Sequence, residues 1–580
     1  MCFEKIFKGK RSSLFLLVLI VFLGGLLRFW KLDWGNGYLF HPDEYHVAAS
    51  VTQLSFPKQM NPHFFSYGSF TVYLIYFTQL LLSILHKNQA NLFFQAILLG
   101  RFYAALFSTL TIPVVFYITR RLIPKSGYAY LSAFLVSILP GSIQQAHFAT
   151  PESNLTFWMV ATLLFLIKAR GQKKINTGWL WLASACLGIA AGVKVIAITF
   201  LPLFPLLAIT LFPIRSLKLF KFFKSWQKLI GWFLKNTFFP PLITLATFFL
   251  VFPFSFLDYP SFRNNFNYES GVGIGNPVVF YTRQFIKTVP GIFQLEKIFP
   301  YALGPTVEIL GILGFLLIII LLARSSLKRK FPPAYYSSLI VLAAFLLYVL
   351  PNAFLFAKWT RFMAPSFPFF AIFSTYFVFC LFTSPHLAKI TPRHFFYLLL
   401  LPLLLIHFFW TVMFFSIYQK PDVRVTATRW INENLPPDSI ILVEAGNMLE
   451  VPLSGNQQRI GFDFYNFEEN PSLKQQFPQL LEKSDYFIVQ SRRMFANFQR
   501  LPEQFPKTAR FYDLLFGGQL GFEKIEEFNA YPQFSILKLR LFVPDEKAEE
   551  TWSVFDHPVI RIYKKVHYFS ESFYEAILQL

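Results

Sequence analysis

The sequence predicts a polytopic α-helical membrane protein that carries an α/β domain at its C-terminal end. Three observations support this prediction. Hydrophobic residues make up 54% of the 580 residues and the mean hydropathy is +0.46, too apolar for a water-soluble globule. Long apolar runs recur from the N-terminus to Tyr418, separated by short basic blocks. After Tyr418 the runs stop, and shorter elements bounded by proline and glycine replace them.

The apolar runs have the length of membrane spans. A spanning helix needs roughly 20 mostly apolar residues, and residues 12–29, 128–143 and 395–417 are examples of such runs. The first run follows several basic residues, as a signal peptide would, but Gly24 and Gly25 lead into bulky residues and not into a cleavage site of small residues. We therefore expect a retained anchor.

The basic blocks predict the topology, because short cytoplasmic loops collect Lys and Arg. The blocks are the N-terminus with Lys5 to Arg11, Arg120 to Lys125, Lys168 to Lys174, Arg215 to Lys235 and Arg324 to Lys330. Placing them inside, together with the loop from His386 to His394, predicts about eleven transmembrane helices in a cell membrane, with a cytoplasmic N-terminus and an extracytoplasmic C-terminus. The net charge of +22 forms no single continuous face, so we expect no nucleic-acid partner.

This topology sets the domain boundaries. Residues 1–419 form the transmembrane domain, with external loops at 30–91 and 258–300. Residues 70–86 are apolar, but counting them as a span would reverse the sign of every later loop, so we predict a helix at the outer interface. Residues 420–580 form a soluble extracytoplasmic α/β domain, with helices predicted at 425–434 and 511–516 and strands at 439–443, 486–489 and 559–563.

The segment His41-Pro42-Asp43-Glu44-Tyr45-His46 follows the first span and carries two neighbouring carboxylates. Carboxylates at the edge of hydrocarbon suit acid–base chemistry, because partial loss of water strengthens their affinity for a proton. In a transferase, Asp43 or Glu44 would take the proton from an acceptor hydroxyl or amine. A solvated Pro-Asp turn is an alternative, and the histidines and acids are potential metal ligands. The spacing matches no helical zinc motif, and the proline disfavours a regular helix, so we predict no metal site.

Further polar residues are expected on the same outer face. Glu152 and His147 lie in the polar hairpin 144–154, where Pro151 and Glu152 either contact substrate or simply start the next helix. Arg101 either pairs with one of the two carboxylates or marks the interface.

Lys194 and Arg361 lie at outer span ends, where such cations bind a lipid phosphate or extend to lipid headgroups. The sequence has no glycine-rich nucleotide loop, which favours a lipid-linked donor over a nucleotide donor.

These motifs resemble the membrane-embedded GT-C glycosyltransferases, in the group of protein O-mannosyltransferases and bacterial aminoarabinose-lipid A transferases (glycosyltransferase family 39-like). The resemblance covers most of the chain and is strongest at residues 41–45. The matching segments are His41 to Tyr45, Gly100 to Ser108 with Tyr117 to Leu122, Phe148 to Glu152, Gly188 to Lys194, Arg361 to Pro365 and the tail Ala548 to Pro558. The second acidic loop departs from the family pattern, because Glu152 stands where an aspartate is common.

The resemblance implies an inverting transfer of a sugar from a polyprenyl-phosphate carrier to an acceptor protein or glycolipid of the cell envelope. Asp43 would be the general base, and Glu44 would position the acceptor or Asp43 itself. Lys194 and Arg361 would hold the donor phosphate, with His41, His46, Arg101, His147 and Glu152 as further substrate-binding residues. Relatives of this type need no catalytic metal or bound cofactor, so the expected partners are the lipid-linked donor, membrane lipids and the acceptor.

Two other classes of protein fit a polytopic chain. A transporter or flippase of a lipid-linked glycan usually shows repeats and charges near the bilayer midplane, whereas the acidic residues here lie in external loops. A non-catalytic scaffold for the α/β domain leaves Asp43 and Glu44 unexplained, and it would retain its function after Asp43→Asn.

Overall fold

The structure is a computed structural model that describes residues 10–85, 91–171, 174–211, 230–332, 334–384, 393–446, 450–536 and 539–579. The chain forms two compact units. The helical unit comprises Met1–Leu32, Asp43–Ile274 and Val289–Thr411, and the C-terminal unit comprises Asp33–Pro42, Gly275–Thr288 and Val412–Leu580. Basic residues predicted to be cytoplasmic at Lys5, at Lys8, in 215–229 and at His386 lie outside the described residues.

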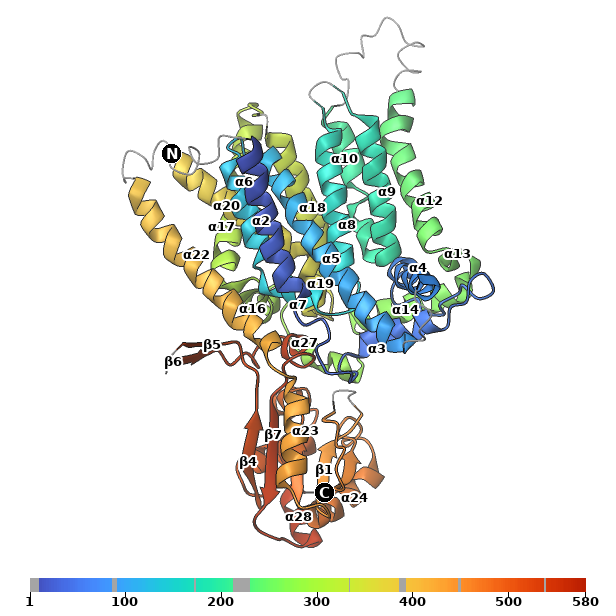
Figure 1. The fold of residues 1–580 in the computed structure, drawn as a ribbon, viewed down its shortest axis with the longest axis vertical. Helices are drawn as coiled ribbons and strands as arrows, with labels where there is room; N and C mark the ends of the chain where they lie inside the picture. Colours follow the sequence, from blue (N-terminus) through green and yellow to red (C-terminus); the bar gives the residue numbers. More distant parts are fainter. Residues whose placement is uncertain are drawn as a thin grey trace, which may run out of the picture. The chain divides into compact units, whose positions relative to one another are not determined.

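The helical unit consists of apolar helices, most of them running lengthwise in Figure 1. In chain order they are α2 (Lys10–Phe29), α3 (Pro42–Thr52), α4 (Ser69–Leu85), α5 (Leu92–Leu122), α6 (Gly127–Ser137), α7 (Pro140–Ala146), α8 (Glu152–Ala169), α9 (Thr177–Val193), η1 (Val195–Phe200), α10 (Leu203–Ile209), η3 (Leu234–Phe238), α12 (Phe239–Val251), α13 (Phe254–Leu257), α14 (Tyr259–Ile274), α15 (Ile292–Lys297), α16 (Phe299–Ala302), α17 (Gly304–Leu327), α18 (Tyr335–Phe354), α19 (Thr360–Met363), η5 (Ala364–Ser366), α20 (Phe367–Thr383) and α22 (Arg393–Phe415).

The helical unit confirms the predicted multi-pass membrane fold. Within the described residues, six helices are long and apolar enough to cross a membrane. They are Leu92–Leu122, Ile230–Val251, Gly304–Leu327, Tyr335–Phe354, Thr360–Thr383 and Leu398–Gln419. Shorter apolar helices such as Ser13–Phe29 and Thr177–Val193 accompany them. The predicted number of about eleven transmembrane helices stays a prediction.

Helix α4 corresponds to the segment predicted to lie at the interface. Figure 1 shows α4 end-on where α5, α8 and α9 appear lengthwise, so its axis runs across theirs. Its buried Val72 and Ile75 pack with Val47 and Val51 of α3 and Ile97 of α5. An apolar helix that crosses the direction of the spans is the arrangement of an interfacial helix.

The run predicted as one continuous span at 128–143 is instead broken into α6 and α7. Helix α6 ends at Ser137 and α7 begins at Pro140, because a proline inside a helix removes a backbone donor. The carbonyl groups that the break leaves without a helical partner bind Arg28 of α2. Its guanidinium donates to the carbonyl oxygens of Val136 (2.9 Å) and Ser137 (2.7 Å). In lipid such carbonyls need a partner within the protein.

The C-terminal unit is an α/β domain, as predicted. Its strands are β1 (Ile440–Glu444), β2 (Gln458–Phe462), β3 (Tyr486–Val489), β4 (Phe522–Phe528), β5 (Gln533–Ile536), β6 (Leu539–Phe542) and β7 (Ile560–Lys565). Its helices are η4 (Phe280–Phe285), η6 (Ser416–Gln419), α23 (Val423–Asn434), α24 (Pro471–Lys483), α25 (Phe495–Gln499), α26 (Pro506–Phe516), α27 (Glu550–Ser553) and α28 (Glu571–Leu578). The predicted strand 486–489 agrees with β3 in both bounds, and the other predicted elements agree within a few residues.

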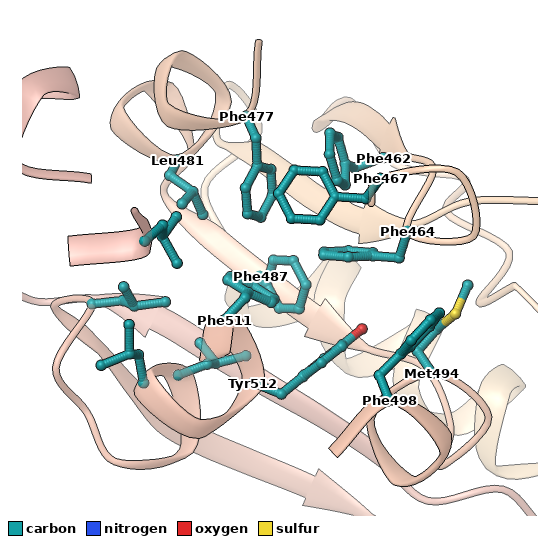
Figure 2. Close-up of a cluster of buried hydrophobic side chains, with 14 of the residues drawn as sticks. Phe462, Phe464, Phe467, Phe477, Leu481, Phe487, Met494, Phe498, Phe511 and Tyr512 are labelled. Carbon is teal, nitrogen blue, oxygen red and sulfur yellow. The ribbon is translucent and has the colours of Figure 1, made fainter. Parts of the chain in front are cut away.

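The main sheet has the strand order β2-β1-β3-β7-β4. The strands β2, β1 and β3 are parallel, while β7 is antiparallel to β3 and β4. One side of the sheet buries an aromatic cluster, in which Phe462, Phe477 and Phe511 are prominent (Figure 2). The other side buries apolar residues of α23, including Ala427 and Ile431.

Two segments from the predicted external loops belong to the C-terminal unit. In the first, the ring of Phe40 lies 3.7 Å from the guanidinium carbon of Arg424. In the second, Gln284 donates to Glu549 (2.8 Å) and accepts from the backbone amide of Glu550 (3.1 Å). The chain between residues 33 and 42 is therefore packed on the α/β domain directly before Asp43.

Candidate functional site

Helix α3 carries both predicted carboxylates. It begins at Pro42, so Asp43 and Glu44 lie in its first turn. The expectation that Pro42 disfavours a regular helix here is wrong, because proline at the first helical position costs no hydrogen bond and its fixed φ suits the helix. Carboxylates are also stabilised at this end by the helix dipole.

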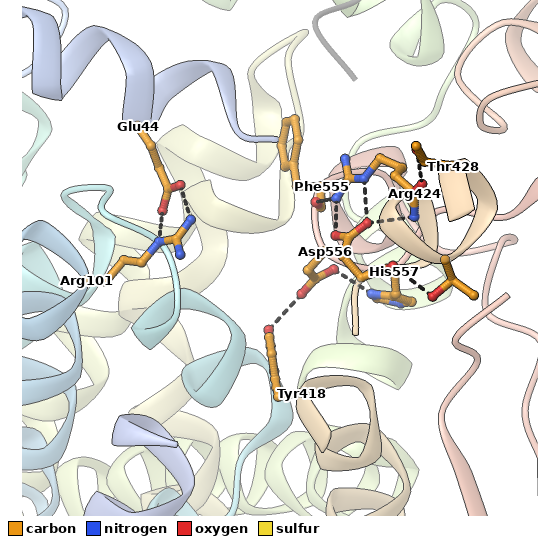
Figure 3. A network of polar contacts seen from close by, with 10 residues as sticks. Glu44, Arg101, Tyr418, Arg424, Thr428, Phe555, Asp556 and His557 are labelled. Atoms are coloured by element: carbon orange, nitrogen blue, oxygen red, sulfur yellow. Dashed lines mark hydrogen bonds and ion pairs between the residues drawn. The ribbon is translucent and has the colours of Figure 1, made fainter. Parts of the chain in front are cut away.

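Glu44 is fully engaged with neighbouring elements. Its carboxylate accepts two hydrogen bonds from Arg101 of α5, from Nε (2.8 Å) and from an Nη (2.6 Å), as Figure 3 shows. Oε1 also accepts from the backbone amide of Ala149 (2.8 Å), and the Arg101 guanidinium donates to the carbonyl of Leu32 (2.7 Å). The side chains of Arg101 and Glu44 are only 4% and 2% exposed. The pairing of Arg101 with one of the carboxylates was one of its two predicted alternatives. The pair connects α3 and α5 with the backbone at Leu32 and at Ala149.

Asp43 has a different environment from its neighbour. Its carboxylate forms an ion pair with Arg361 at the start of the α19 turn. Asp43 is 23% exposed and Arg361 is 19% exposed, so both groups remain within reach of a ligand. The Arg361 guanidinium also lies 3.4 Å from the Tyr67 hydroxyl and 5.0 Å from the centroid of the Trp359 ring.

Glu152 and Lys194 form a second acid–base pair. The Lys194 Nζ lies 3.0 Å from Oε1 of Glu152, whose other oxygen is buried with no hydrogen-bond partner among the described residues. Helix α8 begins at Glu152, which confirms the predicted helix start at Pro151 and Glu152, and α9 ends just before Lys194. Glu152 is 1% exposed and Lys194 18% exposed, so the ammonium is the accessible partner.

Tyr67 connects the two pairs, and the sequence analysis did not single it out. Its hydroxyl is beside Arg361, and its ring centroid lies 5.6 Å from Nζ of Lys194. The ring of Phe362 lies 4.6 Å from the same Nζ. The chain has 26 tyrosines, and no spacing pattern distinguishes this one before the fold is known.

A close backbone contact holds Tyr67 in register with Lys194. The amide of Gly68 donates to the carbonyl of Val193 at 3.0 Å. A Cβ on Gly68 would lie 1.9 Å from the carbonyl oxygen of Gly192, so only glycine fits. The contact thereby keeps Tyr67, which precedes Gly68, beside Lys194, which follows Val193.

The predicted histidines serve other contacts. His147 is buried, with Nδ1 2.8 Å from the carbonyl of Ile143 and Nε2 2.8 Å from the carbonyl of Trp30. His46 is exposed and its ring stacks on Phe64 with centroids 6.2 Å apart. His41 belongs to the C-terminal unit, where its ring centroid lies 4.1 Å from that of Phe555. Among the described residues, no group of three or more His, Cys, Asp or Glu side chains could hold a metal ion.

The fold and this site define a multi-pass membrane protein in which two partly exposed acid–base pairs gather around one tyrosine. Residues 18–259 match the model of the dolichyl-phosphate-mannose-protein mannosyltransferase family. The matched segment includes Asp43, Glu44, Glu152 and Lys194, and it ends before Arg361. The resemblance to this family that the motifs indicated is confirmed over this part of the chain.

Solved structures of membrane enzymes are similar to the chain at low sequence identity, and no curated protein matches the chain significantly. The oligosaccharyltransferase AglB of Archaeoglobus fulgidus, in complex with an inhibitory peptide and a dolichol-phosphate, shares 15% identity at a TM-score of 0.49, over 86% of this chain and 72% of that one. ArnT of Cupriavidus metallidurans, bound to undecaprenyl phosphate, shares 15% identity at a TM-score of 0.45, over 85% of this chain and 95% of that one.

Proposed function

We propose that this chain is an inverting glycosyltransferase that moves a sugar from a polyprenyl-phosphate carrier to an acceptor at the outer face of the membrane. The observation that carries the proposal is the ion pair of Asp43 with Arg361, partly exposed and next to the Glu152–Lys194 pair. The family match over residues 18–259 supports the same class of reaction.

The residues divide the chemistry between a base and two cations. Asp43 takes the proton from the acceptor hydroxyl or amine while the acceptor atom bonds to the anomeric carbon of the sugar. The bond between that carbon and the phosphate oxygen breaks in the same step, so the configuration inverts. Polyprenyl phosphate then leaves with one more negative charge than the bound donor carried. Arg361 and Lys194 stabilise this charge with ionised hydrogen-bond donors.

Glu44 acts as a positioning residue in this mechanism. Both of its oxygens already accept hydrogen bonds, from Arg101 and from the Ala149 amide, and its side chain is only 2% exposed. Its burial and its pairing with Arg101 disfavour contact with an acceptor. Its anchored carboxylate instead fixes the first turn of α3 and hence the direction of Asp43.

The distribution of charge along the helices supports an outer location for the site and a cytoplasmic N-terminus. Arg101 and Arg120 lie on the same helix, α5, about 28 Å apart at the rise of an α-helix, which is close to the thickness of the hydrocarbon core. Helix α8 likewise carries Glu152 in its first turn and Lys168 in its last. Basic residues at the far ends mark the cytoplasmic side, so the ends with Arg101 and Glu152 face outward.

The test uses membranes that contain the full-length protein and polyprenyl phosphates loaded with radiolabelled mannose, glucose or aminoarabinose. The wild type should transfer label from one of these donors to envelope material, and Asp43→Asn should abolish the transfer at equal expression. Asp33→Asn is the matched control, because Asp33 is an exposed acid of the same loop region. Unchanged transfer by Asp43→Asn, or no transfer by the wild type from any donor, would contradict the proposal.

A further inference from the structure

A small β-hairpin in the C-terminal unit exposes an unusual amount of apolar surface. It consists of β5 and β6, which pair only with each other among the described strands. The exposed fractions are 53% for Ile536, 58% for Leu539, 42% for Leu541 and 53% for Phe542. A two-stranded sheet is at best marginally stable in water, and an exposed apolar edge invites aggregation. Something must therefore cover this hairpin.

The hairpin is attached to the end of a membrane span. The backbone amide of Gln533, the first residue of β5, donates to Oγ of Ser416 at 3.2 Å. Ser416 lies in η6, within the last turns of the apolar helix Leu398–Gln419, which is long enough to cross the membrane. Residues from Val412 onward, Ser416 included, belong to the same compact unit as the hairpin. This attachment places the hairpin at the level where the span leaves the lipid.

Basic side chains accompany the apolar ones. Arg540 lies on β6, and its Nε donates to Oε1 of Gln533 at 3.0 Å. Lys420 follows the span end directly, and burial together with the nearby charge of Arg540 lowers the pKa of its ammonium group. Two neighbouring cations repel each other in water, but both are stabilised when an anionic lipid headgroup lies between them.

We propose that the β5–β6 hairpin is a membrane-docking element, which inserts Ile536, Leu539 and Leu541 of one face into the outer leaflet while Arg540 and Lys420 bind an anionic lipid headgroup. The occupant of its apolar surface is the bilayer that the helix Leu398–Gln419 spans. Amphipathic elements bind membranes through this combination of buried apolar area and attraction to anionic lipid. The hairpin would thus anchor the C-terminal unit to the membrane surface independently of the proposed transferase chemistry.

The experiment measures lipid contact in the full-length protein in nanodiscs. Single nitroxide labels are introduced through Leu539→Cys and Ile536→Cys, in a background in which Cys2, Cys186 and Cys380 have been replaced. The labels should be relaxed strongly by dissolved oxygen and weakly by a water-soluble nickel chelate. Leu405→Cys, on the exposed lipid side of α22, is the positive control, and Ser572→Cys, exposed on α28, is the control for water.

Two outcomes would overturn the proposal. Labels at positions 536 and 539 that respond to the nickel chelate as strongly as the label at position 572 would place the hairpin in water. Strong dipolar coupling between labels on two copies, without oxygen exposure, would instead assign the hairpin to pairing between chains.

The charge part of the proposal has its own readout. Amide hydrogen exchange of β5 and β6 should be several-fold slower in nanodiscs that contain anionic lipid than in purely zwitterionic ones. Arg540→Glu should remove this difference, while exchange in β7 stays unchanged and reports that the domain is still folded. Equal exchange of the wild type in both kinds of nanodisc would refute the headgroup contact.

Discussion

The carboxylate of Asp43 and the guanidinium of Arg361 form an ion pair although 318 residues separate them in the chain. The pair joins the first turn of α3 to the α19 turn. A donor phosphate that binds Arg361 would compete with Asp43 for the guanidinium and release the carboxylate for proton transfer. In the proposed mechanism, the pair is thus the resting arrangement of the base and a phosphate-binding group.

Replacing Arg361 should slow catalysis. Arg361→Met should lower kcat by a factor on the order of 10²–10³, the usual effect of removing one preorganised donor to a developing charge. Arg361→Lys should recover part of the rate, since it keeps the charge but loses the forked geometry. Steady-state kinetics with the radiolabelled donor give both values. Arg263→Met, at an exposed arginine of α14, is the control and should be neutral.

Replacing Lys194 should weaken binding of the donor more than it slows the transfer step. A hydrogen bond to a charged group contributes about 1.5–3 kcal/mol, so Lys194→Met should raise the donor KM roughly 10–100-fold. Lys287→Met is a suitable control, because Lys287 is 58% exposed in a surface ion pair of the C-terminal unit. An unchanged KM for Lys194→Met would remove Lys194 from phosphate binding.

The Glu44–Arg101 pair predicts a loss of stability when one partner is removed. Both side chains are nearly fully buried, and an isolated buried charge costs roughly 3–5 kcal/mol. Glu44→Leu and Arg101→Met alone should each lower the thermal unfolding midpoint in detergent. The double variant should be more stable than either single one, because it leaves no unpaired charge. Additive losses in the double variant would show that the two residues do not act as a pair.

Because Gly68 packs directly on Gly192, replacing Gly68 should lower the activity although no charged residue is changed. Gly68→Ala forces the two backbones apart and so moves Tyr67 away from Lys194. A displacement of this kind can cost on the order of 10²-fold in rate. Gly273→Ala is the control, because its new Cβ would meet its nearest neighbour only at 3.9 Å. Wild-type kinetics for Gly68→Ala would show that the register of these segments does not matter.

His557 predicts a pH dependence of stability in the C-terminal unit. Its Nδ1 lies 2.5 Å from Asp556 and its Nε2 2.9 Å from Asp545. Burial lowers the pKa of the imidazole, but the negative charges of Asp556 and Asp545 outweigh it and raise the pKa from 6.5 to about 10. Because the folded-state pKa is the higher one, the stabilisation is complete below pH 6.5 and is lost as the pH rises through about 10.

Hydrogen-exchange protection factors of the β7 amides in the full-length protein measure this effect. They should fall between pH 6.5 and about 10 in the wild type. His557→Gln cannot be charged, so its protection should start lower and change little over the same range. Glu444, whose pKa burial raises from 4.5 to about 7, titrates in the wild type and in the variant alike, so the difference between the two profiles reports His557. A wild-type profile as flat as that of the variant would contradict the prediction.

Local sequence patterns were sufficient for much of the fold. Apolar runs of span length predicted the membrane helices, because a bilayer accepts only segments that satisfy their own backbone hydrogen bonds. Alternating short elements after Tyr418 predicted β3 in both bounds. The break between α6 and α7 was missed although Pro140 marks it locally, because the partner of the freed carbonyls, Arg28, lies about a hundred residues earlier in the chain.

The sequence by itself determined that the chain is a multi-pass membrane protein with an α/β region after Tyr418, and which charged residues follow or begin its apolar runs. Only the tertiary structure decided their partners: Asp43 with Arg361, Glu44 with Arg101, Glu152 with Lys194, and Tyr67 between the first and last of these pairs. Hydropathy and charge patterns report the solvent around each segment, and that information is local. An ion pair depends on the packing of distant helices, which no single segment encodes.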